Sequence, residues 1–99
     1  MNEKELLELA AKSAGMSYPK WNEVHNYMMI GLGSDTKEWN PLTDDGDALR
    51  LAVKLGLGIR FYLDGVGAGE EYEMNHEDPY AATRRAIVRA ASEIGRGME

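Results

Sequence analysis

The chain has no cysteine in its 99 residues and no long hydrophobic run. The first absence excludes a disulfide framework, a thiolate nucleophile and a thiolate metal site. The second excludes a membrane-spanning helix, which needs roughly 20 predominantly apolar residues. The N-terminal segment MNEKELLELAAK also lacks the basic and apolar regions of a secretory signal. We therefore expect a cytoplasmic protein without a membrane partner.

Basic residues are also scarce, because 11 Lys and Arg stand against 17 Asp and Glu, a net charge of −6. Nonspecific affinity for nucleic acids comes chiefly from basic side chains that neutralise phosphates. Direct nucleic-acid binding is therefore not expected. An acidic surface of this kind serves solubility or steers the protein toward a basic partner.

What is present suits one small domain over residues 1–99, because 43% hydrophobic residues are enough for a core. Periodicity predicts helices over residues 3–14, from 43 or 44 to 55, and 79–94, each followed by a glycine. Alternation predicts strands over residues 25–32, 57–63 and 71–74, and GVGAG at 65–69 reads as a turn. The order αβαββα indicates an α+β domain, with a three-stranded, mainly antiparallel sheet packed with three helices.

The middle predicted helix is apolar around much of its circumference. At 100° per residue, its Leu, Ala and Val side chains fill roughly 200°, and only Asp47, Arg50 and Lys54 form a polar stripe. A helix that covers one sheet face needs a narrower apolar stripe. We therefore expect this helix to be buried on two sides, either within the domain or at an interface that allows a homodimer.

Two segments carry a family resemblance: WNPLTDDGDALRLAVKLGL at residues 39–57 and DPYAATRRAIVRAASEIGR at residues 78–96. Both resemble segments of small phage and prophage proteins described as an αβα (ABA) sandwich domain. More distantly, they resemble the phage Nin-region X proteins. The resemblance implies a phage origin and a layered fold, and it implies no catalytic residues.

The start of the middle helix carries the acidic cluster Asp44, Asp45 and Asp47. Carboxylates at a loop-to-helix junction can bind Mg²⁺ or Ca²⁺ through oxygen. However, TDDGD lacks the twelve-residue calcium-loop pattern, and helix N-termini attract acidic residues through capping and the helix dipole. Capping is therefore the favoured role.

Histidines and nucleophiles give little support for an enzyme. A zinc site at His25 or His76 would need carboxylate ligands, which EMNHED at residues 73–78 could supply. We interpret that segment as a solvated acidic loop, because short motifs often match by chance. No serine stands in a recognised nucleophile motif. We expect a non-enzymatic protein without a cofactor.

Arg84 falls on the apolar face of the last predicted helix, whereas the neighbouring arginines face outward. A guanidinium in that position needs a partner, because an unpaired buried charge is costly. The structural interpretation is an ion pair with Asp44, Asp47 or Asp78, or a long side chain whose charged end reaches solvent at the edge of the apolar face. The functional interpretation is a bidentate clamp on a phosphate or carboxylate. We favour the structural interpretation.

Trp21 and Trp39 are the two tryptophans, a residue type enriched in binding hot spots. Trp39 precedes Asn40, in a loop of the kind where binding residues often lie. Core packing is the default role of a tryptophan. If one of them is exposed beside Tyr18 and Tyr27, a protein or a stacked base becomes a plausible ligand.

These observations lead to three hypotheses about function. The leading one is a non-enzymatic phage accessory protein that binds and inhibits a host protein, such as a component of a bacterial immune system. The alternative is a protein that binds and sequesters a small nucleotide signal. The second alternative is a hydrolase that depends on a divalent metal. The candidate binding residues are Trp21, Trp39, Asn40, Asp44, Asp45 and Arg84.

Overall fold

The computed structural model, which describes residues 2–16 and 19–98, contains three helices and six strands. The predicted α+β class is confirmed, although the order along the chain is αβββαβββα. A short 3-10 turn, η1, precedes β3. The elements are α1 (Glu3–Ser13), β1 (Lys20–Asn22), β2 (Tyr27–Ile30), η1 (Gly33–Asp35), β3 (Lys37–Trp39), α2 (Asp45–Leu55), β4 (Ile59–Phe61), β5 (Gly65–Ala68), β6 (Glu71–Met74) and α3 (Pro79–Gly97).

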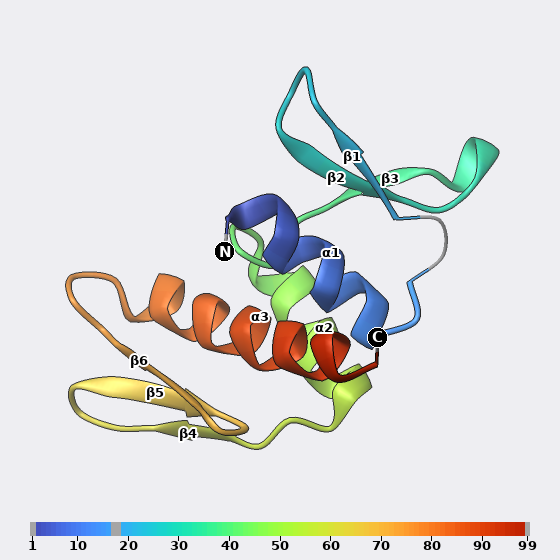
Figure 1. The fold of residues 1–99 in the computed structure, drawn as a ribbon. Helices are drawn as coiled ribbons and strands as arrows, with labels where there is room; N and C mark the ends of the chain where they lie inside the picture. Colours follow the sequence, from blue (N-terminus) through green and yellow to red (C-terminus); the bar gives the residue numbers. More distant parts are fainter. Residues whose placement is uncertain (1, 17–18, 99) are drawn as a thin grey trace.

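Most of the fold packs on α3. The helices α1 and α2 contact it, and so do strands β5 and β6. Figure 1 shows α3 across the middle of the molecule, with α1 and β1–β3 above it and β4–β6 below. In the described parts of the chain, no helix combines the length and the apolar character needed to cross a bilayer.

The strands form two antiparallel three-stranded sheets, in the orders β1-β2-β3 and β4-β5-β6, so the prediction of a single sheet is wrong. The strand predicted at residues 25–32 is shortened to β2 and pairs with two neighbours of three residues each. Three residues are too few to show alternation in a sequence. The predicted strands at 57–63 and 71–74 correspond to β4 and β6.

The turn predicted at residues 65–69 is also wrong, because Gly65–Ala68 form β5, the central strand of the second sheet. All residues of β5 are buried. Its small side chains let α3 approach one face of the strand. On the other face, a Cβ at Gly65 would overlap the Tyr72 hydroxyl, and one at Gly67 would lie 2.8 Å from Arg60 Nη2. Glycine is needed here for close packing across the sheet.

The predicted starts of the first and last helices are confirmed, and the middle helix begins at Asp45, one residue after the later of the two predicted starts. Asn2, Asp44 and Asp78 each precede a helix and accept a hydrogen bond from a backbone N–H of its first turn. This satisfies donors that have no partner within the helix. Gly56, with φ of 64°, ends α2 in the left-handed conformation that favours glycine.

The predicted stop of α3 at Gly95 is wrong, because this helix continues to Gly97. Gly95 is buried where α1 crosses α3, and a Cβ there would overlap the carbonyl oxygen of Leu9. The glycine therefore permits a close helix crossing. Packing of this kind outweighs the roughly 1 kcal/mol that glycine costs inside a helix.

The prediction that α2 is buried on two sides is wrong for this chain alone. It buries Ala48, Leu51 and Ala52, while Leu49 is 60% exposed and Val53 72% exposed. The contacts of α2 are chiefly with α3. One apolar side of α2 therefore faces solvent.

Candidate functional site

A groove of about 460 Å³ lies between α2, α3 and the edge strand β4. The side of α3 between its first and third turns forms the middle of the groove, α2 forms one wall and Phe61 of β4 forms the other. Most of the lining surface is apolar. The lining residues are Asp45, Ala48, Leu49, Phe61, Pro79, Tyr80, Thr83, Arg84 and Ile87.

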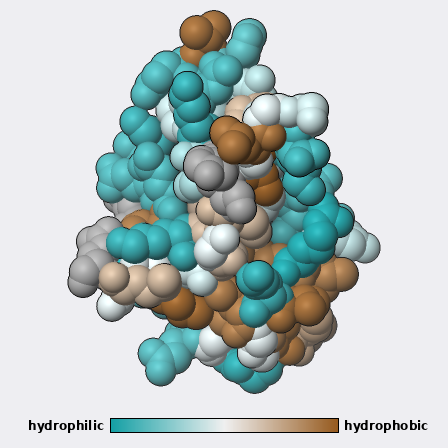
Figure 2. Space-filling model, turned by 90° about the vertical axis from the view of Figure 1, so that its right-hand side faces the viewer, coloured by the Kyte–Doolittle hydropathy of each residue, from teal (hydrophilic) through white to brown (hydrophobic). Residues whose placement is uncertain are grey.

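Three large side chains of this groove are exposed: Leu49 by 60%, Phe61 by 73% and Tyr80 by 69%. They come from α2, β4 and α3, so the fold gathers them from distant parts of the sequence. On the side of the molecule that lies to the right in Figure 1, Figure 2 shows hydrophobic residues gathered in the lower part and hydrophilic residues over much of the upper part. Exposed apolar patches with a polar margin commonly mark binding surfaces.

Arg84 lies at the margin of this groove with 17% of its side chain exposed. Its Nε donates to the Leu42 carbonyl oxygen at 2.9 Å, and its Nη1 lies 2.5 Å from Asp45 Oδ1. The predicted ion pair is present, but the partner is Asp45 and not Asp44, Asp47 or Asp78. A phosphate bound here would have to displace the Asp45 carboxylate.

The other aspartates of the cluster support the loop that leads into α2. The Asp44 side chain accepts from the Asp47 N–H at 2.8 Å. Asp47 in turn accepts from the backbone N–H of Asn40 at 2.9 Å and from Arg50 Nη2 at 2.8 Å. The buried Asn40 side chain accepts from the Leu42 N–H at 2.9 Å. Asn40 and Asp44 thus shape the backbone beside the groove.

The two tryptophans do not lie in the groove. Trp39 is 2% exposed and pairs with Met28 across β2 and β3, so an exposed binding role for it is wrong. Trp21 on β1 is half-buried and packs against the core. Tyr18 lies outside the described residues, and Tyr27 makes an edge-on ring contact with His25 at 5.8 Å.

Two of the carboxylates near His76, those of Glu73 and Asp78, have partners. Glu73 accepts from Arg85 Nε at 3.0 Å and from Arg89, both on α3. The Asp78 side chain caps α3. Within residues 2–16 and 19–98, no group of three or more His, Asp or Glu side chains is placed to hold a metal ion.

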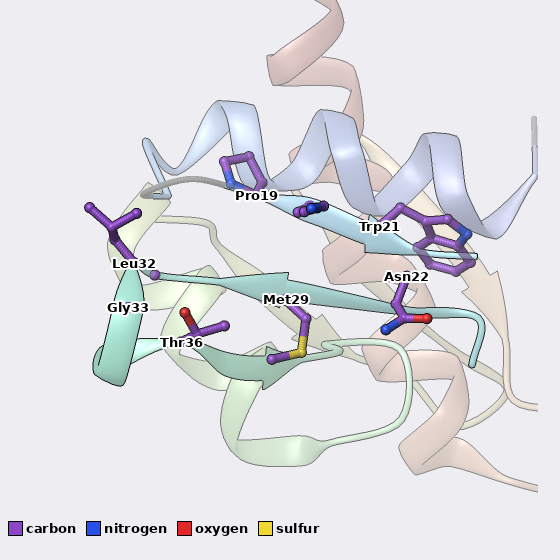
Figure 3. Close-up of a pocket in the computed structure, with 9 residues that line it drawn as sticks. Pro19, Trp21, Asn22, Met29, Leu32, Gly33 and Thr36 are labelled. Atoms are coloured by element: carbon purple, nitrogen blue, oxygen red, sulfur yellow. The ribbon is translucent and has the colours of Figure 1, made fainter. Parts of the chain in front are cut away.

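A second cleft, of about 650 Å³, lies on the first sheet (Figure 3). Trp21 and Asn22 of β1, Met29 of β2 and Thr36 line it together with the η1 turn. Its surface mixes amide, hydroxyl and apolar groups. Leu32, 64% exposed, is the most exposed hydrophobic side chain there. This cleft therefore offers fewer large apolar anchors than the groove beside α2.

Of the predicted binding residues, only Asp45 and Arg84 line the groove, while Asn40 and Asp44 lie together in the loop beside it, where the Asp44 N–H donates to the Asn40 carbonyl oxygen at 2.9 Å. The apolar anchors Leu49, Phe61 and Tyr80 were not among the predicted site residues. The broad apolar surface of the middle helix could have indicated that Leu49 is exposed for binding. Phe61 and Tyr80 had no local signal, because a side chain on an alternating strand or on a helix stripe is expected to be buried.

The comparisons with known proteins add no relative. Neither a protein family, nor a curated protein, nor a solved structure matches this chain.

Proposed function

We propose that this chain is a non-enzymatic phage accessory protein that binds and inhibits a host protein in the bacterial cytoplasm. The exposed apolar groove between α2, α3 and β4 is the observation that carries this proposal. Leu49, Phe61 and Tyr80 offer three anchors at its mouth. A few anchors, often aromatic, supply most of the free energy in protein interfaces.

The partner segment that fits this groove best is an amphipathic helix with basic residues at its margins. A groove floored by one helix and walled by another accepts the apolar face of a third helix. The Asp44 and Asp45 side chains beside it are 58% and 69% exposed. With the net charge of −6, they favour Lys or Arg on the partner.

The phage part of the proposal rests on the family resemblance of residues 39–57 and 78–96. These two segments contain α2 and most of α3, which supply eight of the nine residues that line the groove. A host immune component is a suitable target, because a small binder that covers a partner's helix can block its assembly. The resemblance and the groove thus point to the same part of the chain.

The test compares capture of host proteins from a bacterial lysate by three baits. Leu49→Glu places a charge in the groove, and Leu32→Glu is the matched control, because Leu32, between β2 and η1, is 64% exposed and Leu49 is 60% exposed. We expect a specific partner whose affinity falls roughly ten-fold or more with Leu49→Glu, as for an interface hot spot. The Leu32→Glu bait should capture it like the wild type.

Binding of a basic partner should also weaken as salt is raised, because the net charge of −6 would attract it through screened charges. Equal capture by all three baits, or no specific partner, would contradict the proposal. Thermal stabilisation by a nucleotide in a ligand panel, without specific protein capture, would instead favour the small-ligand hypothesis.

A further inference from the structure

The second sheet packs one face on α3 and leaves the opposite face open to solvent. Glu71 and Glu73 of β6 form ion pairs with arginines of α3, so they point to the helix side. Successive residues of a strand point to opposite faces. Tyr72 and Met74, which alternate with the two glutamates, therefore lie on the open face. This sheet is at the lower edge of the molecule in Figure 1.

The central strand β5 has glycine at both of its positions on the open face. Pairing between the strands places Arg60, Gly67 and Tyr72 in one row. A Cβ at Gly65 would overlap the Tyr72 hydroxyl, so this ring reaches across β5. In the same way, the Arg60 guanidinium lies against Gly67. The glycines thus let planar side chains of the outer strands cover the central strand.

Hydrogen bonds hold these planar groups in place. Arg60 Nε donates to the Tyr62 hydroxyl oxygen at 3.1 Å, and its Nη2 donates to the Gly69 carbonyl oxygen at 2.9 Å. The Tyr72 hydroxyl donates to Asp64 Oδ1 at 3.0 Å. The two tyrosine rings have centroids 6.1 Å apart and planes inclined at 50°, and the residues are 49% and 47% exposed. We call Arg60, Tyr62 and Tyr72 the tyrosine platform.

The donors of this platform require a ligand that supplies hydrogen-bond acceptors. The Tyr62 oxygen accepts from Arg60, so the hydroxyl hydrogen can be donated to a ligand. Arg60 uses Nε and Nη2 within the protein, and its Nη1 can donate outward. A suitable ligand therefore combines flat apolar groups, which pack on the rings, with carbonyl oxygens beside them.

A proline-rich segment in the polyproline II conformation has this combination. Its pyrrolidine rings are apolar, its prolines have no backbone N–H, and its carbonyl groups are free to accept hydrogen bonds. Protein modules that bind such segments do so through surfaces lined by aromatic side chains. Charge favours the same ligand over a nucleic-acid strand, which could also stack on the rings, because the net charge of −6 repels phosphates but not a neutral peptide.

We propose that the open face of the second sheet binds a proline-rich segment of a partner protein. The proline rings pack on Tyr62 and Tyr72, and the carbonyl groups accept from the Tyr62 hydroxyl and from Arg60. The groove beside α2 is a separate surface, because Phe61, which lines it, points to the opposite face of β4 from Arg60. This inference therefore does not rest on the host-binding proposal.

Nuclear magnetic resonance titration with a polyproline peptide of about ten residues tests the inference. The amide signals of Gly65 and Gly67 and the ring signals of the two platform tyrosines should shift as the peptide is added. The methyl signals of Leu49 in the groove should not shift. A glycine-serine peptide of the same length is the control ligand and should cause no shifts, because it lacks the rings that pack on tyrosine.

Substitutions at Tyr62 separate the contribution of its ring from that of its hydroxyl. Tyr62→Phe keeps the ring and should weaken peptide binding roughly three- to ten-fold, as expected for one lost hydrogen bond. Tyr62→Ala removes both and should weaken binding more than about ten-fold. Tyr80→Ala is the matched control, since Tyr80 is an exposed tyrosine of the groove. It should bind the peptide like the wild type.

Salt distinguishes a neutral ligand from a charged one. Raising sodium chloride from about 50 to about 500 mM should change the affinity for the peptide by less than about two-fold, because the peptide carries no charges to screen. Shifts of the platform signals with a single-stranded oligonucleotide, and none with the peptide, would overturn the proposed ligand class.

Three other results would overturn the inference: no shifts with the polyproline peptide, equal shifts with the glycine-serine peptide, or unchanged affinity of Tyr62→Ala. Each of these leaves host capture through the groove intact. Conversely, Leu49→Glu should bind the peptide like the wild type. Loss of host capture by Leu49→Glu therefore concerns the host-binding proposal alone.

Discussion

The two three-stranded sheets have the same topology, but different chemistry holds each of them to the helices. The first sheet inserts large apolar side chains into the core, namely Met28, Ile30 and Trp39. The second sheet packs β5 closely on α3 through small residues. Its border is fixed by ion pairs of Arg85 and Arg89 with glutamates of β6. The first sheet is held to the helices by large apolar side chains. The second is held by the close approach that small side chains allow and by ion pairs.

This difference explains where each sheet leaves free surface. Large side chains of the first sheet point inward, and charged residues occupy its outer strands. In the second sheet, the small residues of β5 fill the contact with α3, so the large side chains of the hairpin are left outside. Phe61, Tyr62 and Leu63 are 73%, 49% and 101% exposed. The second sheet is therefore the one suited to contact other molecules.

The largest loss of stability is expected from a substitution in the first sheet. Trp39→Ala removes a side chain that is 2% exposed and should lower the free energy of unfolding by about 3–5 kcal/mol. Tyr80→Ala is the control, since Tyr80 is 69% exposed and its loss should change stability by less than about 0.5 kcal/mol. Urea denaturation followed by circular dichroism measures both. Similar losses for the two variants would contradict the inward position of Trp39.

A smaller effect is expected from adding volume to the second sheet. Gly65→Ala should lower the free energy of unfolding by about 1–3 kcal/mol, because the new Cβ would lie 2.6 Å from the Glu73 carbonyl oxygen. The atoms nearest to a Cβ at Gly67 belong to the Arg60 side chain, which can shift, so Gly67→Ala should cost less than about 1 kcal/mol. The same urea titration compares them. Equal costs would show that backbone clearance does not control this sheet.

The smallest effect concerns pH. Partial burial, followed by the hydrogen bond to Asp64 at 3.0 Å, raises the pKa of Tyr72 above its ordinary value of 10.0. The folded state thus favours the neutral phenol. The resulting stabilisation is complete below pH 10 and is lost as pH rises through the folded-state pKa.

Asp64→Asn removes the charge beside the hydroxyl and should lower the pKa of Tyr72 toward its ordinary value. Nuclear magnetic resonance of carbon-13-labelled tyrosine follows the titration of this ring separately from the others. Identical titrations of Tyr72 in the two proteins would contradict the role of Asp64.

The helices were largely predictable from the sequence because their signals are local. Asn2, Asp44 and Asp78 stand beside the donors that they cap, and Gly56 ends α2 where its backbone needs a positive φ. The strand β5 was not predictable in this way. Its run of small residues resembles a turn until α3, much later in the chain, packs against it.

In the candidate site too, local sequence signals did not predict contacts between distant residues. The helical position of Arg84 indicated a half-buried guanidinium, but the geometry of the loop before α2 decides which aspartate it meets. Trp39 lies in a segment that looked like an exposed loop. Pairing of β3 with β2 turns its ring inward, and that pairing is a contact between distant residues.

The central place of α3 has a consequence for how the chain folds as it is made. Residues 79–97 are translated after α1, α2 and β5, so those elements have no surface on which to bury their apolar sides until α3 leaves the ribosome. Much of the apolar surface of α1, α2 and β5 can therefore be buried only after α3 is complete. A nascent chain halted before α3 would be a substrate for chaperones and proteases.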